Sequence, residues 1–560
     1  MSWGSGICYS PFMRFLNSLA VGLALALAGG IGLCGLTAEA GNVAGTWHFA
    51  GSAQLTNNPD FDNVDKIFTM APSGDFRNYI LDRFAGWLNK WLFASTMSNN
   101  ASLLRPLLDD LLSAETVWAL GGTRSNSPDF IVALRLDDGR AQAWQAVLPK
   151  LAGGPGQAYQ AQKFDGKQWN LASGESLWAV RVKSWLLVGR GKNLVDTMGE
   201  YLAQIGQNDH PAPPLNKSWL EADLDWAQLA RWLPEAPHVL LAPRTKVVFT
   251  AGDHTLYVNA SISYPNPIPW KFEDWRIPTN LIRDPLISFT AGQDIAAYMS
   301  PNEPLSKLTD NPLAGQYFVW SLGDLVFRTH AAWPVADATN TIKRIGAEAP
   351  AAFNPALKEM GAGELRWQPE RNALAWENVG PFIVPDLQVA PETNGQYLAV
   401  SLFPLINRGK PAPDELWQQI TGHTNIVYYD WEDTGSRLGP WQTLGAILPV
   451  LPRLELPLVT NNPGTTNRQM ARALPTPVVV DENWLNGLRP FLTHRETITL
   501  ITRVSPTELK LVRQSPFVVT SLELVLLSHW LSGTASPGIN TSMLPPRAKV
   551  TGPGIPSKSP

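Results

Sequence analysis

The 560 residues, 44% of them hydrophobic, suffice for about two to four domains with substantial cores. The 44 Lys and Arg nearly balance the 48 Asp and Glu, which gives a formal charge of -4. The chain therefore lacks the excess of basic residues that is typical of nucleic-acid-binding proteins. A mean hydropathy of -0.09 excludes a chain of many membrane spans and a chain disordered throughout.

The first forty residues are typical of an export segment. The basic Arg14 precedes an uncharged run over residues 15–38, and Ala38-Glu39-Ala40 would suit a signal peptidase. The run is also long enough to be an uncleaved membrane anchor. The sequence therefore predicts a signal peptide or membrane anchor over residues 1–40. The protein is expected in the periplasm or cell envelope, touching the membrane only through residues 15–38 if the segment stays uncleaved.

Both cysteines, Cys8 and Cys34, lie inside this segment. Lipidation of Cys34 is disfavoured because the bulky Leu33 stands where a small residue is usual. A chain cleaved after Ala40 would contain no thiol, which excludes disulfides, Cys nucleophiles and Cys-based zinc sites. Core burial alone would then have to stabilise the exported body.

A short strand and two helices are predicted after the leader. Residues Trp47 to Leu55 have the mixed apolar pattern of a strand, closed by Asn57-Asn58-Pro59. From Asp75 onward, apolar residues recur at spacings of three and four, and Ser102 to Leu112 presents one wide leucine face. Both patterns indicate amphipathic helices.

The periodicity then changes from helical to extended, with β-formers bounded by turn residues. We expect hairpins separated by helices in this part of the chain. The predicted elements are strands at 116–121 and 129–136, a helix around Trp144, a hairpin over 176–189, a helix over 193–204 and a hairpin over 246–264 that turns at Gly252-Asp253.

The second half of the sequence is expected to repeat this arrangement. The strand Leu325–Trp333 and the helix from Ala338 parallel residues 129–136 and their helix, and we match the strand from Leu398 with Leu256–Tyr264. A hairpin over 498–513 and a terminal helix over 519–531 complete the predicted elements.

These elements predict an α+β fold with two similar halves, each an antiparallel sheet with packed helices. The prolines crowded between 265 and 288 place the boundary there, giving halves over 41–270 and 286–534. Residues 535–560 are rich in Pro, Gly and Ser and are predicted to form a disordered tail.

The leader, residues Trp47 to Leu55, the strand–helix units and Phe289-Thr-Ala-Gly292 at the start of the second half together resemble large uncharacterised exported bacterial proteins built from two related α+β halves. The likeness spans most of the mature chain and contains no diagnostic motif. It implies a location in the cell envelope and supplies no catalytic residues.

Two acidic segments are candidates for cation binding. Glu221, Asp223 and Asp225 alternate and would share one strand face, where carboxylates could bind calcium. Asp225, however, precedes a helical pattern and is a good N-cap, and a calcium loop has more ligands at fixed spacing. We therefore predict no metal site.

The second acidic segment comprises Asp430, Glu432 and Asp433, which precede Thr434-Gly435. We interpret it as a turn. The sequence also contains no HExxH, no GxSxG and no complete phosphate-binding loop, so no cofactor is predicted and no catalytic residue can be named.

The 23 tryptophans are the main compositional signal. Most of them lie in helical or β-rich patterns, where large aromatic side chains fill a core. Four fall in segments containing Pro or Gly and are the predicted ligand-binding residues: Trp270, Trp275, Trp431 and Trp441.

The preferred hypothesis is a non-enzymatic exported or membrane-tethered envelope protein that binds an unidentified ligand or protein partner. Nucleic acid is not expected as a partner. Two alternatives remain open. One is a glycan-binding module that uses the four loop tryptophans. The other is a hydrolase that depends on two carboxylates, which the sequence cannot pair.

Overall fold

The computed structural model describes the chain from residue 43 to residue 532, with gaps. The predicted leader over 1–40 and the predicted tail over 535–560 lie outside the described residues. The gaps are 56–58, 94–97, 123–128, 162, 172–173, 192–194, 230–242, 269–271, 294–314, 324–327, 360, 362, 380–383, 393–394, 404–408, 424 and 448–478.

The strands of the described residues form one sheet, and every pairing between them is antiparallel. The strands numbered up to ten are β1 (Val43–Phe49), β2 (Thr116–Gly121), β3 (Asp129–Arg135), β4 (Gln157–Ala161), β5 (Phe164–Asn170), β6 (Ser176–Val182), β7 (Trp185–Arg190), β8 (Ser218–Asp225), β9 (Arg244–Gly252) and β10 (Thr255–Ser263). The others are β11 (Leu286–Gln293), β12 (Gln316–Leu322), β13 (Thr329–Val335), β14 (Glu364–Gln368), β15 (Ala373–Glu377), β16 (Asp386–Glu392), β17 (Gly395–Ser401), β18 (Ile426–Asp433), β19 (Glu496–Ser505) and β20 (Glu508–Ser515).

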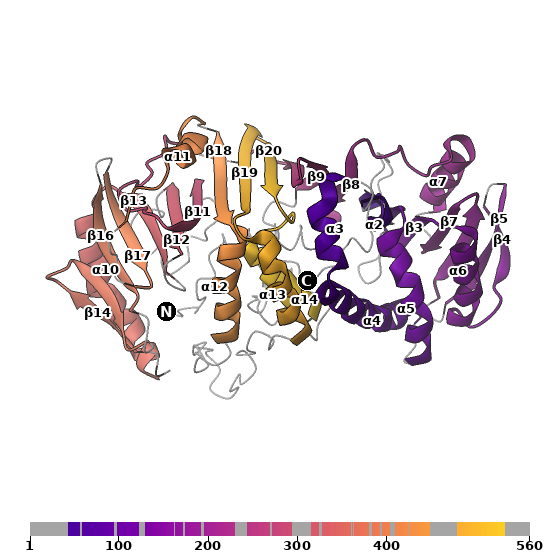
Figure 1. The fold of residues 1–560 in the computed structure, drawn as a ribbon, viewed down its shortest axis with the longest axis horizontal. Helices are drawn as coiled ribbons and strands as arrows, with labels where there is room; N and C mark the ends of the chain where they lie inside the picture. Colours follow the sequence, from indigo (N-terminus) through magenta and orange to yellow (C-terminus); the bar gives the residue numbers. More distant parts are fainter. Residues whose placement is uncertain are drawn as a thin grey trace, which may run out of the picture.

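The two series of strands lie in the sheet in the same order. The first runs from the edge inward as β4-β5-β6-β7-β3-β2-β1-β8-β9-β10. The second runs as β14-β15-β16-β17-β13-β12-β11-β18-β19-β20. Adding ten to each strand number of the first series therefore gives the second. The two series meet where β10 pairs with β20, and β4 and β14 end the sheet on opposite sides (Figure 1).

Helices pack on this sheet, so the predicted α+β class is confirmed. The helices between β1 and β2 are α2 (Ser52–Leu55), α3 (Asp62–Thr69), α4 (Ala71–Phe93) and α5 (Ser98–Ser113). The connecting helices are α6 (Asp138–Leu151), α7 (Val195–Asn208), α8 (Trp226–Leu229), α10 (Ala338–Glu359), α11 (Asp414–Thr421), α12 (Thr434–Ile447) and α13 (Val479–Leu492), and α14 (Ser521–Ser532) follows β20. Figure 1 shows α12, α13 and α14 side by side below β18, β19 and β20.

The central strand pair is symmetric in its register. Asn259 lies opposite Val512, and each is four residues beyond the first residue of its strand, Thr255 in β10 and Glu508 in β20. A pseudo-twofold axis through this residue pair would exchange the two strands.

The registers of β8 and β18 agree in detail. The β8–β9 pairing shifts between Ser218 and Leu220, and the β18–β19 pairing shifts between Ile426 and Tyr428. When these irregularities are superimposed, the last residues of the two strands, Asp225 and Asp433, coincide. Both then cap the helix that follows, because Asp225 accepts from Gln228 N at 3.1 Å and Asp433 accepts from Ser436 N at 3.0 Å.

The strand order corrects one match made from the sequence. The strand containing Leu398 is β17, which pairs with β13 and β16 as β7 pairs with β3 and β6. Its counterpart is therefore the strand over 185–190 and not the strand containing Leu256. Hydrophobic patterns that look alike cannot tell two strands apart when only their neighbours in the sheet differ.

The largest hydrophobic core lies beneath the centre of the sheet and takes side chains from both series. Trp47, Leu220 and Phe249 come from the first series, and Leu511 comes from the second. The late helices α13 and α14 contribute further buried residues, including Leu488. The central helices therefore pack against strands far apart in sequence.

Candidate functional site

One face of β18 carries two carboxylates where a core strand is usually apolar. Side chains alternate along a strand, which puts Asp430 and Glu432 on the face opposite Trp431. Glu432 is buried and Asp430 is partly buried. The interpretation of these two acids as turn residues was therefore wrong, whereas Asp433 does belong to the connection into α12.

Asp430 is held by the neighbouring strand β11. Thr290 lies directly opposite it, and the hydroxyl of Thr290 donates to Asp430 Oδ1 at 2.6 Å. Burial disfavours the charged carboxylate and raises the pKa of Asp430 to about 6, an effect that the Thr290 hydrogen bond partly offsets. The carboxylate therefore holds a proton at higher pH than an ordinary aspartate does.

Glu432 joins the sheet to the start of α14. Its two oxygens accept from Ser521, one from the backbone N at 2.6 Å and the other from the hydroxyl at 2.8 Å. Only 5% of Glu432 is exposed, and burial, together with the charge of Asp430, raises its pKa to about 7. Because both oxygens are already occupied, Glu432 acts as a clamp on the helix.

A guanidinium from α12 lies near the two carboxylates. Arg437 is only 8% exposed and stacks over the Trp441 ring, with its central carbon 4.7 Å from the ring centroid. Glu432 and Asp430 attract this charge, whereas burial lowers the pKa of Arg437. Among the residues that the structure describes, none accepts a hydrogen bond from Arg437 or forms an ion pair with it.

Other buried polar groups on this face fasten α14 to the sheet. Arg513 of β20 donates to both oxygens of Glu523 at 2.7 and 3.0 Å and to the Thr499 hydroxyl at 2.9 Å. Glu523 also accepts from Thr520 N at 2.9 Å, and the Thr520 hydroxyl accepts from Glu523 N at 3.3 Å. This reciprocal pair is a capping box, so these residues have a structural role.

Two tyrosines complete the surroundings of Asp430. The Tyr317 ring lies over Gly292, where a Cβ atom would be 2.2 Å from it. Burial and then the charge of Asp430 raise the pKa of Tyr317 and of Tyr428 well above the ordinary value. Both phenols therefore stay protonated near neutral pH.

The same positions in the first half of the sheet are apolar. With β8 superimposed on β18, Ala222 takes the place of Asp430 and Leu224 takes the place of Glu432. Trp47 lies opposite Ala222 as Thr290 lies opposite Asp430. All three first-half residues are buried in the central core. The polar character of this face is thus confined to the second half.

Of the four tryptophans predicted to bind ligand, the three that the structure describes pack against two different cores. Trp275 and Trp431 are half-buried and pack against a core that contains Phe289, on the other face of β18. Trp441 packs against the central core and lies under Arg437, and Trp270 falls outside the described residues. Of the three described tryptophans, Trp441 is the one that contacts Arg437.

The sequence predicted that all four tryptophans lie in loops. For two of them this prediction was wrong. Trp431 belongs to β18, and Trp441 belongs to α12. Gly439-Pro440 suggested a loop before Trp441, yet α12 contains this proline in its interior. The N-cap Asp433 at the end of the strand is the sequence signal for this helix.

The acids of β8 have protein partners. Asp223 accepts two hydrogen bonds from Arg244 at 2.7 and 2.9 Å, and Asp225 caps α8 as predicted. Over the described parts of the chain, no group of three or more His, Cys, Asp or Glu side chains is placed to hold a metal ion.

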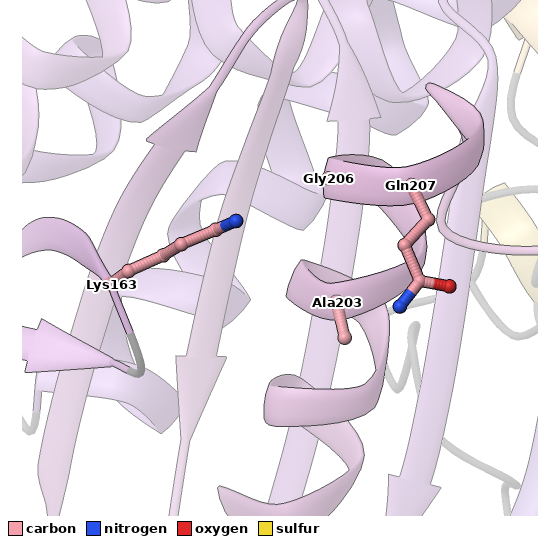
Figure 2. Close-up of a pocket in the computed structure, with 4 residues that line it drawn as sticks. All are labelled: Lys163, Ala203, Gly206 and Gln207. Atoms are coloured by element: carbon pink, nitrogen blue, oxygen red, sulfur yellow. The ribbon is translucent and has the colours of Figure 1, made fainter.

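A separate open pocket of about 330 Å³ lies near the edge of the sheet (Figure 2). Lys163, in the turn between β4 and β5, points toward α7, which contributes Ala203, Gly206 and Gln207. The lining offers one cation and one amide without a carboxylate. Such a lining has no pair of groups for acid–base chemistry.

None of the described helices is long and apolar enough to cross a membrane. The predicted anchor over 15–38 lies outside the described residues.

No protein family matches this sequence, and neither a characterised protein nor a solved structure is similar to the chain.

The raised pKa values predict a pH dependence of stability. The folded chain holds protons on Asp430 and Glu432 more tightly than the unfolded chain does. In the unfolded chain the pKa values of these groups are 3.8 and 4.5. Between about pH 4 and pH 7 these two groups therefore make the free energy of unfolding fall as the pH rises. Asp430→Asn should reduce that fall by about 2 to 3 kcal/mol. Urea unfolding of the wild type and of Asp430→Asn at pH 4 to 8 measures this difference. Parallel pH profiles of the two proteins would contradict the raised pKa of Asp430.

Proposed function

We propose that the chain is an exported or membrane-tethered envelope protein without enzymatic activity, which binds a small polar ligand beside Asp430. The observation that carries the proposal is the contrast between the two halves. Asp430, Glu432 and Arg437 lie in the second half, and apolar residues occupy the carboxylate positions in the first half.

The physical reason is the cost of burying charge. An unpaired charge in a protein interior destabilises the fold, and such groups persist mainly where function requires them. The first half accommodates Trp47, Ala222 and Leu224 at the corresponding positions, so this sheet tolerates an apolar face. Part of the polar set, namely Glu432 and Arg513, anchors α14. Asp430 and Arg437 have no such anchoring role.

The two halves are proposed to derive from a tandem duplication, with halves over 41–270 and 286–534. The shared strand order, the matching register shifts and the two helix-capping aspartates support it. One copy would then have kept an apolar face, and the other would have acquired the binding groups.

A carboxylate-dependent hydrolase is the second candidate, favoured by two carboxylates of raised pKa on one strand face. Both oxygens of Glu432, however, already accept hydrogen bonds from Ser521, which opposes a role as nucleophile or base. Glycan binding by tryptophan is disfavoured because Arg437 covers the Trp441 ring and Trp431 packs into a core.

The stability of two variants distinguishes a binding role from a structural role. The double variant T290V/D430A removes both partners of a hydrogen bond and introduces the alanine found at Ala222. The free energy of unfolding at pH 8 should be unchanged or rise by about 1 to 3 kcal/mol. The matched variant Glu432→Ala should lower it by about 1 to 3 kcal/mol, because the N–H and hydroxyl of Ser521 lose their acceptor. Strong destabilisation by T290V/D430A would assign Asp430 to the fold and overturn the proposal.

The location can be tested by fractionating cells and sequencing the amino terminus of the protein. Cleavage after Ala40 predicts a chain that begins at Gly41 in the soluble envelope fraction, and an uncleaved anchor predicts an intact Met1 in the membrane fraction. Recovery of the full-length chain from the cytosol would contradict the envelope location.

A further inference from the structure

Asp430 and Arg437 carry opposite charges in a poorly solvated region without forming an ion pair. Thr290 holds the carboxylate through Oδ1, and Trp441 supports the guanidinium. Within the described chain, Asp430 accepts no other side-chain hydrogen bond, and Arg437 donates none. Within that part of the chain, one carboxylate oxygen and the guanidinium donors therefore have no hydrogen-bonding partner.

This arrangement departs from the usual pairing of a buried guanidinium. A buried guanidinium normally pairs with a carboxylate in a bidentate geometry, and opposite charges in a region of low dielectric attract strongly. The two side chains come from different elements, β18 and α12, and each is held in place by its own neighbour. The scaffold thus keeps a donor set and an acceptor apart, as a binding site for a ligand with both charges requires.

We propose that Asp430 and Arg437 bind a zwitterionic ligand of the amino-acid class. The ligand carboxylate pairs with Arg437, and the ligand ammonium group donates to Asp430. This inference rests on the proposed binding function and specifies its ligand.

The charges favour a zwitterion over ligands of one sign. An anion alone would lie close to Asp430 and Glu432, which repel it, and a cation alone would leave Arg437 without a partner. A neutral polyol could form hydrogen bonds but would not neutralise either charge. Glu432 cannot replace Asp430, because Ser521 occupies its oxygens.

Isothermal titration calorimetry with glycine and L-alanine tests the proposal on the purified chain. Acetate, methylammonium and glucose serve as probes of the anion, the cation and the polyol. An ammonium group beside Asp430 favours its ionised form, so the amino acids should release protons when they bind at pH 6. Titration in two buffers of different ionisation enthalpy detects the release, whereas an anion bound to Arg437 alone would cause proton uptake.

Two variants locate the binding. Arg437→Met and Asp430→Asn should each weaken amino-acid binding about 10- to 100-fold, as expected for a lost charged hydrogen bond. Asp223→Asn, on the equivalent strand of the first half, is the matched control and should bind like the wild type.

The outcomes separate the two proposals. Amino-acid binding with proton release that both variants weaken to this extent supports the zwitterion. Binding of acetate, methylammonium or glucose alone, lost in the same variants, overturns the zwitterion and leaves the proposed binding function intact. Absence of binding by any probe also overturns it, and the stability of T290V/D430A then decides the proposed function separately.

Discussion

The backbone pairing of β10 with β20 is the constraint on which the rest of the structure depends. Eight residue pairs, from Leu256 opposite Ser515 to Ser263 opposite Glu508, join the two series of strands into one sheet. Without this pairing each series would end in an exposed edge strand. The central core also requires it, because Val258 and Leu511 on these two strands lie in the same hydrophobic cluster between the sheet and the helices.

The same pairing gives the two halves of the sheet a common frame of reference. Each strand has a counterpart in an equivalent position, and the counterpart shows which side chain that position can accommodate. Most of the central face is apolar in the first half, where Trp47 and Leu224 are buried. The departure at Asp430 and Glu432 therefore stands out as a change of chemistry within the same strand order. Glu432 binds the start of α14, and Asp430 lies near enough to Arg437 for their charges to interact.

Much of the secondary structure could be predicted from local patterns. Alternating residues with a short polar turn, such as the hairpin around Asp253, identify their own partner strand. The pairing of β10 with β20 could not be predicted in this way, because no local signal links residues so far apart. The site was missed for a related reason. Tyr428, Asp430 and Glu432 share one face of a strand, yet the acids beside Gly435 favoured a turn. Their contacts with Thr290 and Ser521, which are distant in sequence, reveal that this face is buried.

An engineered disulfide tests the central pairing most directly. Asn259 and Val512 lie opposite each other and are both half-buried on the face away from the central core, and antiparallel neighbours are within the span of a disulfide. In a C8S/C34S background, N259C/V512C should form the bond under mild oxidation, and mass spectrometry of a digest should find the two peptides linked. N259C paired with Q514C, which is displaced along β20, should link far less. Equal linking of both pairs, or none in the first, would contradict the shared sheet and the comparison of halves built on it.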